Sequence, residues 1–416
     1  MPTYLGRLLL VCSRFPPAGG SGVQRVAGWT RHLHDLGWGP AVLTMRERPG
    51  YPRDPSLVGA LPSDLDIERA ACLDAWPIGA RIEAIGARAV GRALRAVASF
   101  PDADAGWLLF AVARGLALAR RHRARVILSS APNWTCHLVG WLLARLLSVP
   151  WVADFRDEWT DHPSYRAFGL AARLARHLET RWLHDAALVV ATSESSRDQF
   201  RARGARRAEA IRNGFDPEAL PEAPWPVAAR GDALRFLYAG ALYGPSDPRP
   251  FLAAIDRLVR SGRLPANEVH VRFAGSWWDH RPAAAAAYPW LEHAGYVEHA
   301  SLVEEYRRAH VLLLFMSGWP RCVLGKLFEC AATGRPCLGV MTAEGETPRL
   351  FREGRLGWLA PWGDDAAIEA AILDAHCAWR EGTLPAGADH AVVAQWTRRR
   401  GAERLASLLE ELDRGR

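Results

Sequence analysis

The chain has 416 residues and a formal net charge of +7, and Lys326 is its single lysine, so that 51 of the 52 basic residues are arginine. A content of 49% hydrophobic and 23% charged residues is typical of globular proteins and argues against a disordered or fibrous chain. No stretch of about 18 residues is apolar throughout, and the seven cysteines form no C-x-x-C pair, which argues against a membrane-spanning helix, a disulfide framework and a structural zinc site. The length predicts two domains, and we expect a cytoplasmic protein.

The first half of the chain is predicted to alternate strands and helices. It opens with a short apolar run at residues 7–13, a loop rich in proline and glycine, and a helical spacing of apolar residues over 23–36. A second strand at 40–44 completes a βαβ start, which favours a parallel sheet covered by helices. The other elements predicted here are helices at 80–100, 107–119, 136–147, 170–184 and 193–203 and strands at 125–129, 151–153, 187–191 and 210–212.

The second half repeats this alternation after a proline-rich linker at 217–231. Its predicted strands are 234–239, 269–274, 311–315 and 337–340, and its predicted helices are 250–261, 302–308, 326–333, 366–379 and 391–412. The sequence therefore predicts an N-terminal domain of residues 1–216 and a C-terminal domain of residues 232–390, two α/β halves with a cleft between them.

A glycine-rich loop, Gly19-Gly20-Ser21-Gly22, lies between the first predicted strand and the first predicted helix. Glycines there let a backbone approach a ligand closely, and the N–H groups at a helix N-terminus attract an anion. The loop is neither a G-x-G-x-x-G motif nor a P-loop, so a flexible connection explains it equally well.

Four charged residues follow the predicted strand at 151–153, in the segment Asp154-Phe155-Arg156-Asp157-Glu158-Trp159. Open α/β sheets bind their ligands at the carboxyl ends of strands, so we expect Arg156 and Asp157 in a catalytic site. The alternative is that an Asp–Arg pair only fixes the loop.

Two segments of the second half also follow this pattern. Tyr238-Ala239-Gly240 ends the strand at 234–239, and we expect Gly240 and the nearby Arg249 to face a phosphate group. Further on, Lys326 and Glu329 lie three residues apart on one face of a predicted helix, where the carboxylate suits the two adjacent hydroxyls of a ribose. A helical ion pair on the surface is the alternative explanation.

Charge and aromatic residues indicate the kind of ligand. The arginine-studded helix at 80–100 can lie on anionic lipid or form a solvated basic face. Anionic small molecules explain the net charge as well, whereas the arginines are spread along the chain without a recognised nucleic-acid module, so we expect no nucleic-acid partner. Trp277-Trp278, after the strand at 269–274, is a candidate loop for stacking a base or a sugar, with Trp277 as the expected contact.

In their order along the chain, these segments resemble the retaining glycosyltransferases of family 4, which have the GT-B fold. The similarity spans nearly the whole chain, and although each motif alone is weak, their order and spacing together are specific. The resemblance is carried by Phe15-Pro16-Pro17-Ala18-Gly19-Gly20-Ser21-Gly22-Val23-Gln24-Arg25, Ser129-Ser130-Ala131-Pro132, the segment 154–159, Asn213-Gly214-Phe215-Asp216, Tyr238-Ala239-Gly240, Gly325-Lys326-Leu327-Phe328-Glu329 and Ala332-Thr333-Gly334-Arg335-Pro336.

The resemblance implies two Rossmann-like α/β/α domains that face each other across a cleft, with a terminal helix in 391–416 packing back on the first. The second domain would bind a nucleotide-diphosphate sugar, and the first an acceptor that is a glycan, a lipid-linked sugar or a small molecule. Glu329 would match the second Glu of the family's E-x7-E pattern and hold the ribose. Lys326 would lie near the diphosphate or the sugar, and Gly20 and its neighbours would face the phosphates.

The chain departs from the family pattern at three places. Arg321 stands where the first Glu of E-x7-E is expected, and the basic pair that often grips the diphosphate after Gly240 is absent, which leaves Arg249. The family's histidine in the first domain is replaced within the segment 154–157, by Arg156. A subgroup with a Lys-Leu-Phe-Glu core shares the first departure, so Arg321 does not imply inactivity and is retained as a substrate-site candidate.

We therefore expect retaining glycosyl transfer in which cationic and backbone groups stabilise the departing nucleoside diphosphate. No Asp-x-Asp motif stands at a suitable strand end, so we expect no metal, and no cofactor beyond the donor substrate. Such an enzyme would serve glycan synthesis, such as that of cell-envelope polysaccharide, in the cytoplasm or at the inner face of the cell membrane. The alternatives are a sugar-nucleotide epimerase with Asp154, Asp157 and His162 as acid–base groups, and a relative that binds a nucleotide sugar without turning it over.

Overall fold

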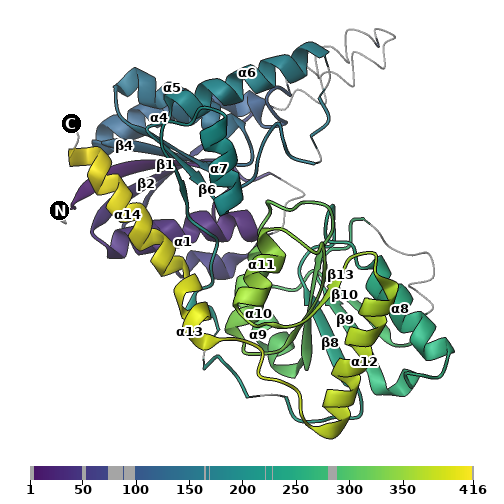
Figure 1. Cartoon of the computed structure of the whole chain (residues 1–416). Helices are drawn as coiled ribbons and strands as arrows, with labels where there is room; N and C mark the ends of the chain where they lie inside the picture. The colour runs from purple at the N-terminus through teal and green to yellow at the C-terminus, as the bar shows by residue number, and fades with distance from the viewer. Residues whose placement is uncertain are drawn as a thin grey trace. The chain divides into compact units, whose positions relative to one another are not determined.

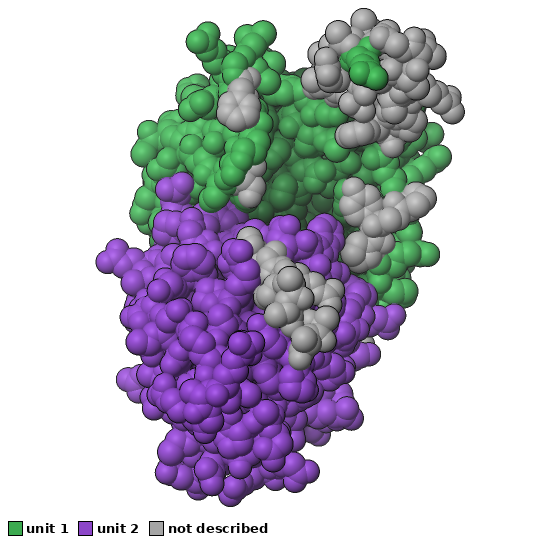
Figure 2. All heavy atoms as spheres, turned by 90° about the vertical axis from the view of Figure 1, so that its right-hand side faces the viewer, with its two compact units in different colours: residues 1–212, 401–416 green, residues 213–400 purple. Residues whose placement is uncertain are grey.

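The computed structural model describes residues 4–48, 53–73, 88, 99–163, 165–167, 169–220, 222–226, 228–279 and 288–414. The predicted helix at 80–100, and with it the predicted lipid-binding face, falls almost entirely outside the described residues. The chain divides into two compact units, which Figure 2 colours separately: residues 1–212 with 401–416 form unit 1, and residues 213–400 form unit 2.

Unit 1 is built on a seven-stranded sheet in the order β3-β2-β1-β4-β5-β6-β7, in which all neighbouring strands run parallel. Its strands are β1 (Gly6–Val11), β2 (Trp38–Met45), β3 (Asp66–Ala70), β4 (Val126–Ala131), β5 (Trp151–Phe155), β6 (Leu188–Ala191) and β7 (Ala208–Ala210). Its described α-helices are α1 (Ser21–Asp35), α4 (Leu108–His122), α5 (Thr135–Leu147), α6 (Gly169–Asp185), α7 (Glu194–Ala202) and most of α14 (Arg398–Arg414).

Helices cover both faces of this sheet, and β1 shows how its sequence produces the two layers (Figure 1). Successive side chains of a strand point to opposite faces. Leu8 and Leu10 pack in a cluster with apolar residues of α1 and α14, whereas Leu9 and Val11 pack in another cluster with residues of α4 and α5. Because both faces are buried, the strand is an unbroken apolar run, which is typical of parallel sheets.

Unit 2 repeats this architecture with a six-stranded parallel sheet in the order β10-β9-β8-β11-β12-β13. Its strands are β8 (Leu234–Ala239), β9 (Val269–Ala274), β10 (Leu291–Gly295), β11 (Val311–Met316), β12 (Cys337–Met341) and β13 (Gly357–Pro361). Its described α-helices are α8 (Arg249–Arg260), α9 (His299–Arg308), α10 (Gly325–Ala332), α11 (Glu346–Glu353), α12 (Asp365–Glu381) and α13 (His390–Val393). Both units are thus Rossmann-like, as predicted.

The strand β8 divides the core of unit 2 in the same way as β1 divides that of unit 1. Phe236 and Tyr238 pack with residues of α8 and α12, and Leu237 and Ala239 pack with residues of α9, α10 and α11. Strands β3, β10 and β13 and the helix α11 had no counterpart among the predicted elements. None of the helices within the described part of the chain is long and apolar enough to cross a bilayer.

The C-terminal segment differs from the single helix predicted at 391–412. It consists of α13, a 3-10 turn over Ala394–Trp396, an extended Thr397 and then α14. The interruption has a packing cause: Trp396 is 5% exposed and packs edge-on against Phe328, and Thr397 pairs with Phe215 as an isolated β-bridge. From residue 401 onward, α14 belongs to unit 1, where Leu405, Leu408 and Leu409 are fully buried.

Candidate active site

Both sheets reverse their strand order beside their first strand, between β1 and β4 in unit 1 and between β8 and β11 in unit 2. The crevice beyond the carboxyl ends of the strands at such a point is where open α/β sheets bind ligands. The predicted site residues can therefore be traced from these two places, one in each unit.

At the reversal in unit 1 lies a cavity of about 170 Å³. It is lined by residues that follow β1 and β4, by the start of α1 and by one side chain that follows β5: Cys12, Ser13, Arg14, Gly19, Gly20, Gly22, Val23, Val26, Ser130, Pro132, Asn133 and Arg156. The cavity thus brings together two segments that the sequence singled out separately, the glycine-rich loop and the charged segment after β5.

The glycine-rich loop starts α1 without a capping side chain. Gly20 stands at the N-cap position with φ of 110°, in the left-handed region that favours glycine, and has no side chain that could accept a hydrogen bond from the helix. The first N–H groups of an α-helix have no acceptor within the helix. Ser21 and Gly22 carry the first of these groups in α1, next to the cavity, which suits an anion.

Arg156 supplies a positive charge to the same cavity. Its Nε donates to the carbonyl of Ala131 at 2.9 Å, and its Nη2 donates to the carbonyl of Pro132, so the guanidinium is fixed against the end of β4. A Cβ built on Gly22 would overlap this guanidinium. Glycine at position 22 is therefore required for Arg156 to lie against the start of α1.

Asp154 and Asp157 have different surroundings although they are three residues apart. Asp154 is fully buried and accepts hydrogen bonds from Arg25 at 2.9 and 3.2 Å and from Ser130 at 2.7 Å, so it fixes the sheet as a structural group. Asp157 is half-buried, and burial raises its pKa against the opposing charges of Arg156 and His162. The raised pKa of Asp157 moves this carboxyl toward the range of an acid–base group.

In unit 2, Lys326 lies near the point where the strand order reverses, between β8 and β11. It is the second residue of α10, and its Nζ donates to the Tyr238 hydroxyl at 2.7 Å and lies 4.0 Å from the centre of that ring. Gly240 follows β8 with φ of 131°, and a Cβ there would overlap the Lys326 ammonium. The Gly240 N–H donates to the carbonyl of Ala274 at 2.7 Å, so it is already engaged within the protein. The contribution of Gly240 to the site is the space that the missing side chain leaves for the Lys326 ammonium.

Glu329, one turn further along α10, is held by an ion pair that the sequence did not predict. Arg398 donates to Glu329 Oε1 at 3.3 Å and to Asp216 Oδ2 at 2.8 Å, and all three side chains are 12–14% exposed. Burial, with the neighbouring charge of Glu329, raises the pKa of Tyr306 well above its usual value. Arg398 lies 182 residues from Asp216 in sequence, so no local pattern could have indicated the pair.

Removing this arginine is expected to lower the free energy of unfolding by about 2 kcal/mol, because two largely buried carboxylates lose the cation between them. The variant is Arg398→Ala, measured by urea denaturation. The matched control is Arg414→Ala in the same helix, whose side chain is 78% exposed and pairs with Glu410 at 2.8 Å. The control is expected to change stability by at most ~0.5 kcal/mol. Equal stability of the Arg398 variant and the wild type would contradict this assignment.

The remaining predicted residues of unit 2 lie around the ends of β8, β9 and β11. Arg249 is the first residue of α8 and forms a two-pronged ion pair with the buried Asp247, at 2.7 Å at its closest. Arg321 is half-buried in the loop between β11 and α10. Trp277 packs edge-on against Phe273 and is only partly buried, so stacking on a ligand by Trp277 stays a prediction.

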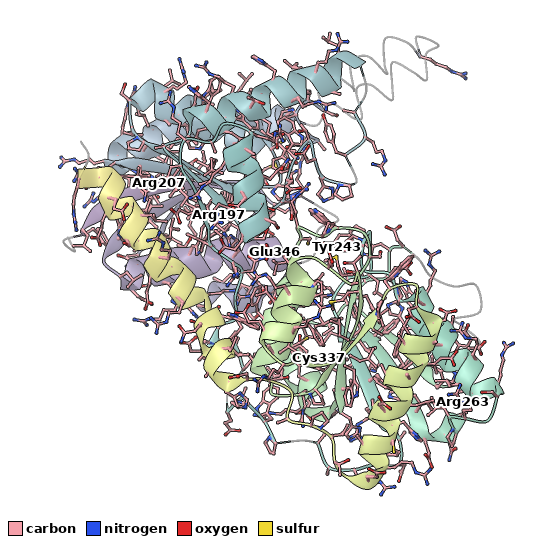
Figure 3. The ribbon with its side chains drawn as sticks, in the orientation of Figure 1. Arg197, Arg207, Tyr243, Arg263, Cys337 and Glu346 are labelled. Carbon is pink, nitrogen blue, oxygen red and sulfur yellow. The ribbon has the colours of Figure 1, made fainter. Side chains whose placement is uncertain are left out.

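Exposed aromatic rings near these strand ends belong to other residues. Trp278 is 71% exposed, and Tyr243, which Figure 3 labels in the loop after β8, is 55% exposed. The tyrosine was not predicted as a site residue. An exposed aromatic residue beside glycines after a buried strand is the signal that could have indicated it.

Comparison with protein families assigns both units. Residues 20–214 match the family model described as a glycosyl transferase 4-like domain, and residues 233–376 match that of glycosyl transferases group 1. The two matches together cover more than half of the chain. The chain belongs to the GT-B glycosyltransferases. No curated protein matches this glycosyltransferase in sequence.

Solved structures share the fold of this glycosyltransferase over nearly its full length. Sucrose-phosphate synthase from Thermosynechococcus elongatus aligns with a TM-score of 0.65 at 15% identity, over 99% of this chain and 100% of that one. HepE from Anabaena, solved with UDP and glucose, aligns with a TM-score of 0.64 at 15% identity, over 98% and 99% of the two chains. The lipopolysaccharide outer core galactosyltransferase WaaB aligns with a TM-score of 0.59 at 12% identity, over 97% and 99%. At 12–15% sequence identity, the similarity to these structures shows a shared fold.

Proposed function

We propose that the enzyme transfers a sugar with retention of configuration from a nucleotide-diphosphate sugar, bound by unit 2, to an acceptor bound by unit 1. The observation that carries this proposal is the position of Lys326, whose ammonium lies on Gly240 at the carboxyl end of β8. A cation placed there, where the strand order reverses, suits the diphosphate of a nucleotide. HepE, which has been solved with UDP-glucose, supports a donor of this class.

The chemistry requires the departure of a nucleoside diphosphate, and this chain has groups that would stabilise its developing charge. Lys326 would interact with the diphosphate, and Glu329 would accept hydrogen bonds from the ribose hydroxyls. In unit 1, the first N–H groups of α1 and the guanidinium of Arg156 border one cavity, where they would attract an anionic group. Asp157, whose pKa is raised by burial, would act on a proton near the acceptor.

The nature of the acceptor and the place of the reaction belong to the same proposal. The resemblance to family 4 favours a glycan, a lipid-linked sugar or a small molecule, and thus synthesis of cell-envelope polysaccharide in the cytoplasm or at the inner face of the membrane. The absence of an Asp-x-Asp motif at a suitable strand end favours a reaction without a metal. Transfer activity that persists in EDTA would support this last point, and its loss would contradict it.

Donor binding is the first test. A thermal-shift series with UDP, GDP, dTDP and ADP sugars is expected to show stabilisation by one nucleotide class, of about 2.7 kcal/mol at a ligand concentration 100 times the dissociation constant. That donor is then incubated with candidate acceptors, and products are identified by mass spectrometry and the anomeric configuration by NMR. If none of these nucleotide sugars stabilises the protein, the proposed function is wrong.

A further inference from the structure

The carboxyl end of the β1–β2–β3 half of unit 1 carries an unusual concentration of arginine. A small groove of about 30 Å³, open to solvent, lies beside the larger cavity described above and shares Ser13 and Arg14 with it. We call it the arginine groove. Its lining is Ser13, Arg14, Phe15, Ala18, Met45, Arg46, Glu47, Arg48, Arg53 and Arg69. Among the described residues that line the groove, five carry a guanidinium group and one carries a carboxylate.

Many arginines elsewhere in the described chain have carboxylate partners, as the three labelled in Figure 3 illustrate, although Arg235 and Arg335 donate to backbone carbonyls instead. Arg197 pairs with Asp198 at 2.7 Å, and Arg207 pairs with Glu411 at 2.5 Å. Arg263 pairs with Glu369 at 3.1 Å. The feature particular to the arginine groove is that five arginines line one place.

Within the groove, the carboxylates are too few and partly too distant to balance the arginines. Arg53 pairs with Glu47 at 3.1 Å. Arg14 and Arg48 share Asp104, which is 1% exposed, at 3.7 and 3.6 Å, beyond ordinary hydrogen-bond distance. One buried carboxylate thus serves two guanidinium groups through long contacts.

The other two arginines donate to backbone carbonyls. Arg46 donates to the backbone carbonyl of Arg69 at 3.3 Å, and Arg69 donates to that of Pro16. Among the residues that the structure describes, neither of the two is paired with a carboxylate. Like charges gathered in this way repel one another unless an anion joins them.

We propose that the arginine groove binds a phosphate group of the acceptor, so that this glycosyltransferase acts on a phosphorylated acceptor. This inference rests on the proposed function, since it places the acceptor in unit 1. A single bidentate guanidinium satisfies a carboxylate, whereas guanidinium groups from β3 and from the segments after β1 and β2 suit the several oxygens and higher charge of a phosphate or diphosphate. Because the groove shares Arg14 with the cavity at the strand reversal, an acceptor anchored here would lie next to that cavity.

The test compares the wild type with a variant that removes the two arginines that donate to backbone carbonyls, Arg46→Gln with Arg69→Gln. Binding of glucose 1-phosphate is measured by calorimetry, and binding to phosphatidylcholine vesicles with and without phosphatidic acid by co-sedimentation. The first ligand represents a soluble phosphorylated acceptor and the second a lipid phosphate. We expect the wild type to bind at least one of them, and the double variant to bind it about 10-fold more weakly through the loss of two charge-assisted contacts.

The matched control removes the same net charge from unit 2, in Arg260→Gln with Arg263→Gln, whose side chains are 75% and 55% exposed. It is expected to bind like the wild type. A second measurement does not depend on the folding of a variant: the bound phosphate compound should protect Arg46 and Arg69 of the wild type from modification by phenylglyoxal, as read by mass spectrometry. Equal affinity of the groove variant and the control, or modification unaffected by ligand, would overturn the proposal.

Failure of this proposal can be distinguished from failure of the proposed function. The groove variant should retain the nucleotide-sugar stabilisation of the wild type, because neither Arg46 nor Arg69 is among the residues proposed to bind the donor. A protein that binds a nucleotide sugar but no phosphate compound contradicts only the acceptor site. A protein that binds phosphate in the groove but no nucleotide sugar contradicts only the donor assignment.

Discussion

Replacing Lys326 by arginine is expected to lower kcat/KM for glycosyl transfer about 100-fold, the effect of losing one charge-stabilising group, although the charge is conserved. The ammonium fits between the Tyr238 hydroxyl, at 2.7 Å, and the backbone of Gly240. A planar guanidinium is larger and needs a different hydrogen-bond geometry, so it would not reach the same position. Steady-state kinetics with the donor found in the thermal-shift series, together with the donor dissociation constant, measure the effect.

The control is the reverse exchange at an exposed position, Arg260→Lys, where the side chain is 75% exposed and pairs with Asp256 at 3.0 Å. Its kinetic constants are expected to equal those of the wild type. Lys326→Ala should resemble Lys326→Arg, because both lose the ammonium at the end of β8. Wild-type activity of the arginine variant would show that positive charge alone suffices, and wild-type activity of the alanine variant would remove Lys326 from the proposed site.

The second large effect concerns stability: Asp154→Ala is expected to lower the free energy of unfolding by about 3–5 kcal/mol, because it leaves a buried guanidinium without its counter-charge. Arg25, its partner, is 4% exposed and also donates to the carbonyls of Ile211 and Arg212, which lead out of unit 1. For a unit of this size the midpoint of thermal unfolding should fall by roughly 10 °C. Calorimetry or circular dichroism measures it.

Asp198→Ala is the matched control, since it removes an aspartate that is 61% exposed and pairs with Arg197 at 2.7 Å. Its effect is expected to stay below about 1 kcal/mol, as for exposed ion pairs in general. If Asp154→Ala were as stable as this control and had lost only activity, the aspartate would be a catalytic group and the structural assignment would be wrong.

The predicted strands and the unpredicted strands occupy different positions in the two sheets. Central strands such as β1, β8 and β11 are buried on both faces, so they are apolar runs that can be recognised without further information. The unpredicted strands β3, β10 and β13 are the outermost strands of their sheets, and their residues are mostly half-buried or exposed. A strand such as Leu291–Gly295, with the sequence LEHAG, carries no apolar periodicity of its own and is a strand because β9 pairs with it.

Some features of the candidate site also follow from the sequence and the sheet topology, whereas others depend on residues that are far away in sequence. The proximity of Lys326 to Gly240 follows from parallel topology, because residues after neighbouring strands meet at one edge of a sheet. The different surroundings of Asp154 and Asp157 depend on Arg25, which is far away in sequence, and so could not be predicted from the segment 154–159. The pairing of Glu329 with Arg398 likewise depends on where the C-terminal segment passes.

The membership of α14 in unit 1 has a consequence for the order in which the chain acquires its structure during synthesis. Unit 2 is continuous over residues 213–400, so all of its sheet has been made before α14 is complete. Unit 1 is not, because Leu405, Leu408 and Leu409 belong to the cluster that covers Leu8 and Leu10. The part of that face that α14 covers therefore stays exposed on the ribosome until residues 401–412 emerge, although α1 already packs on the same face. Exposed apolar surface of this kind on a nascent chain is a target for chaperones.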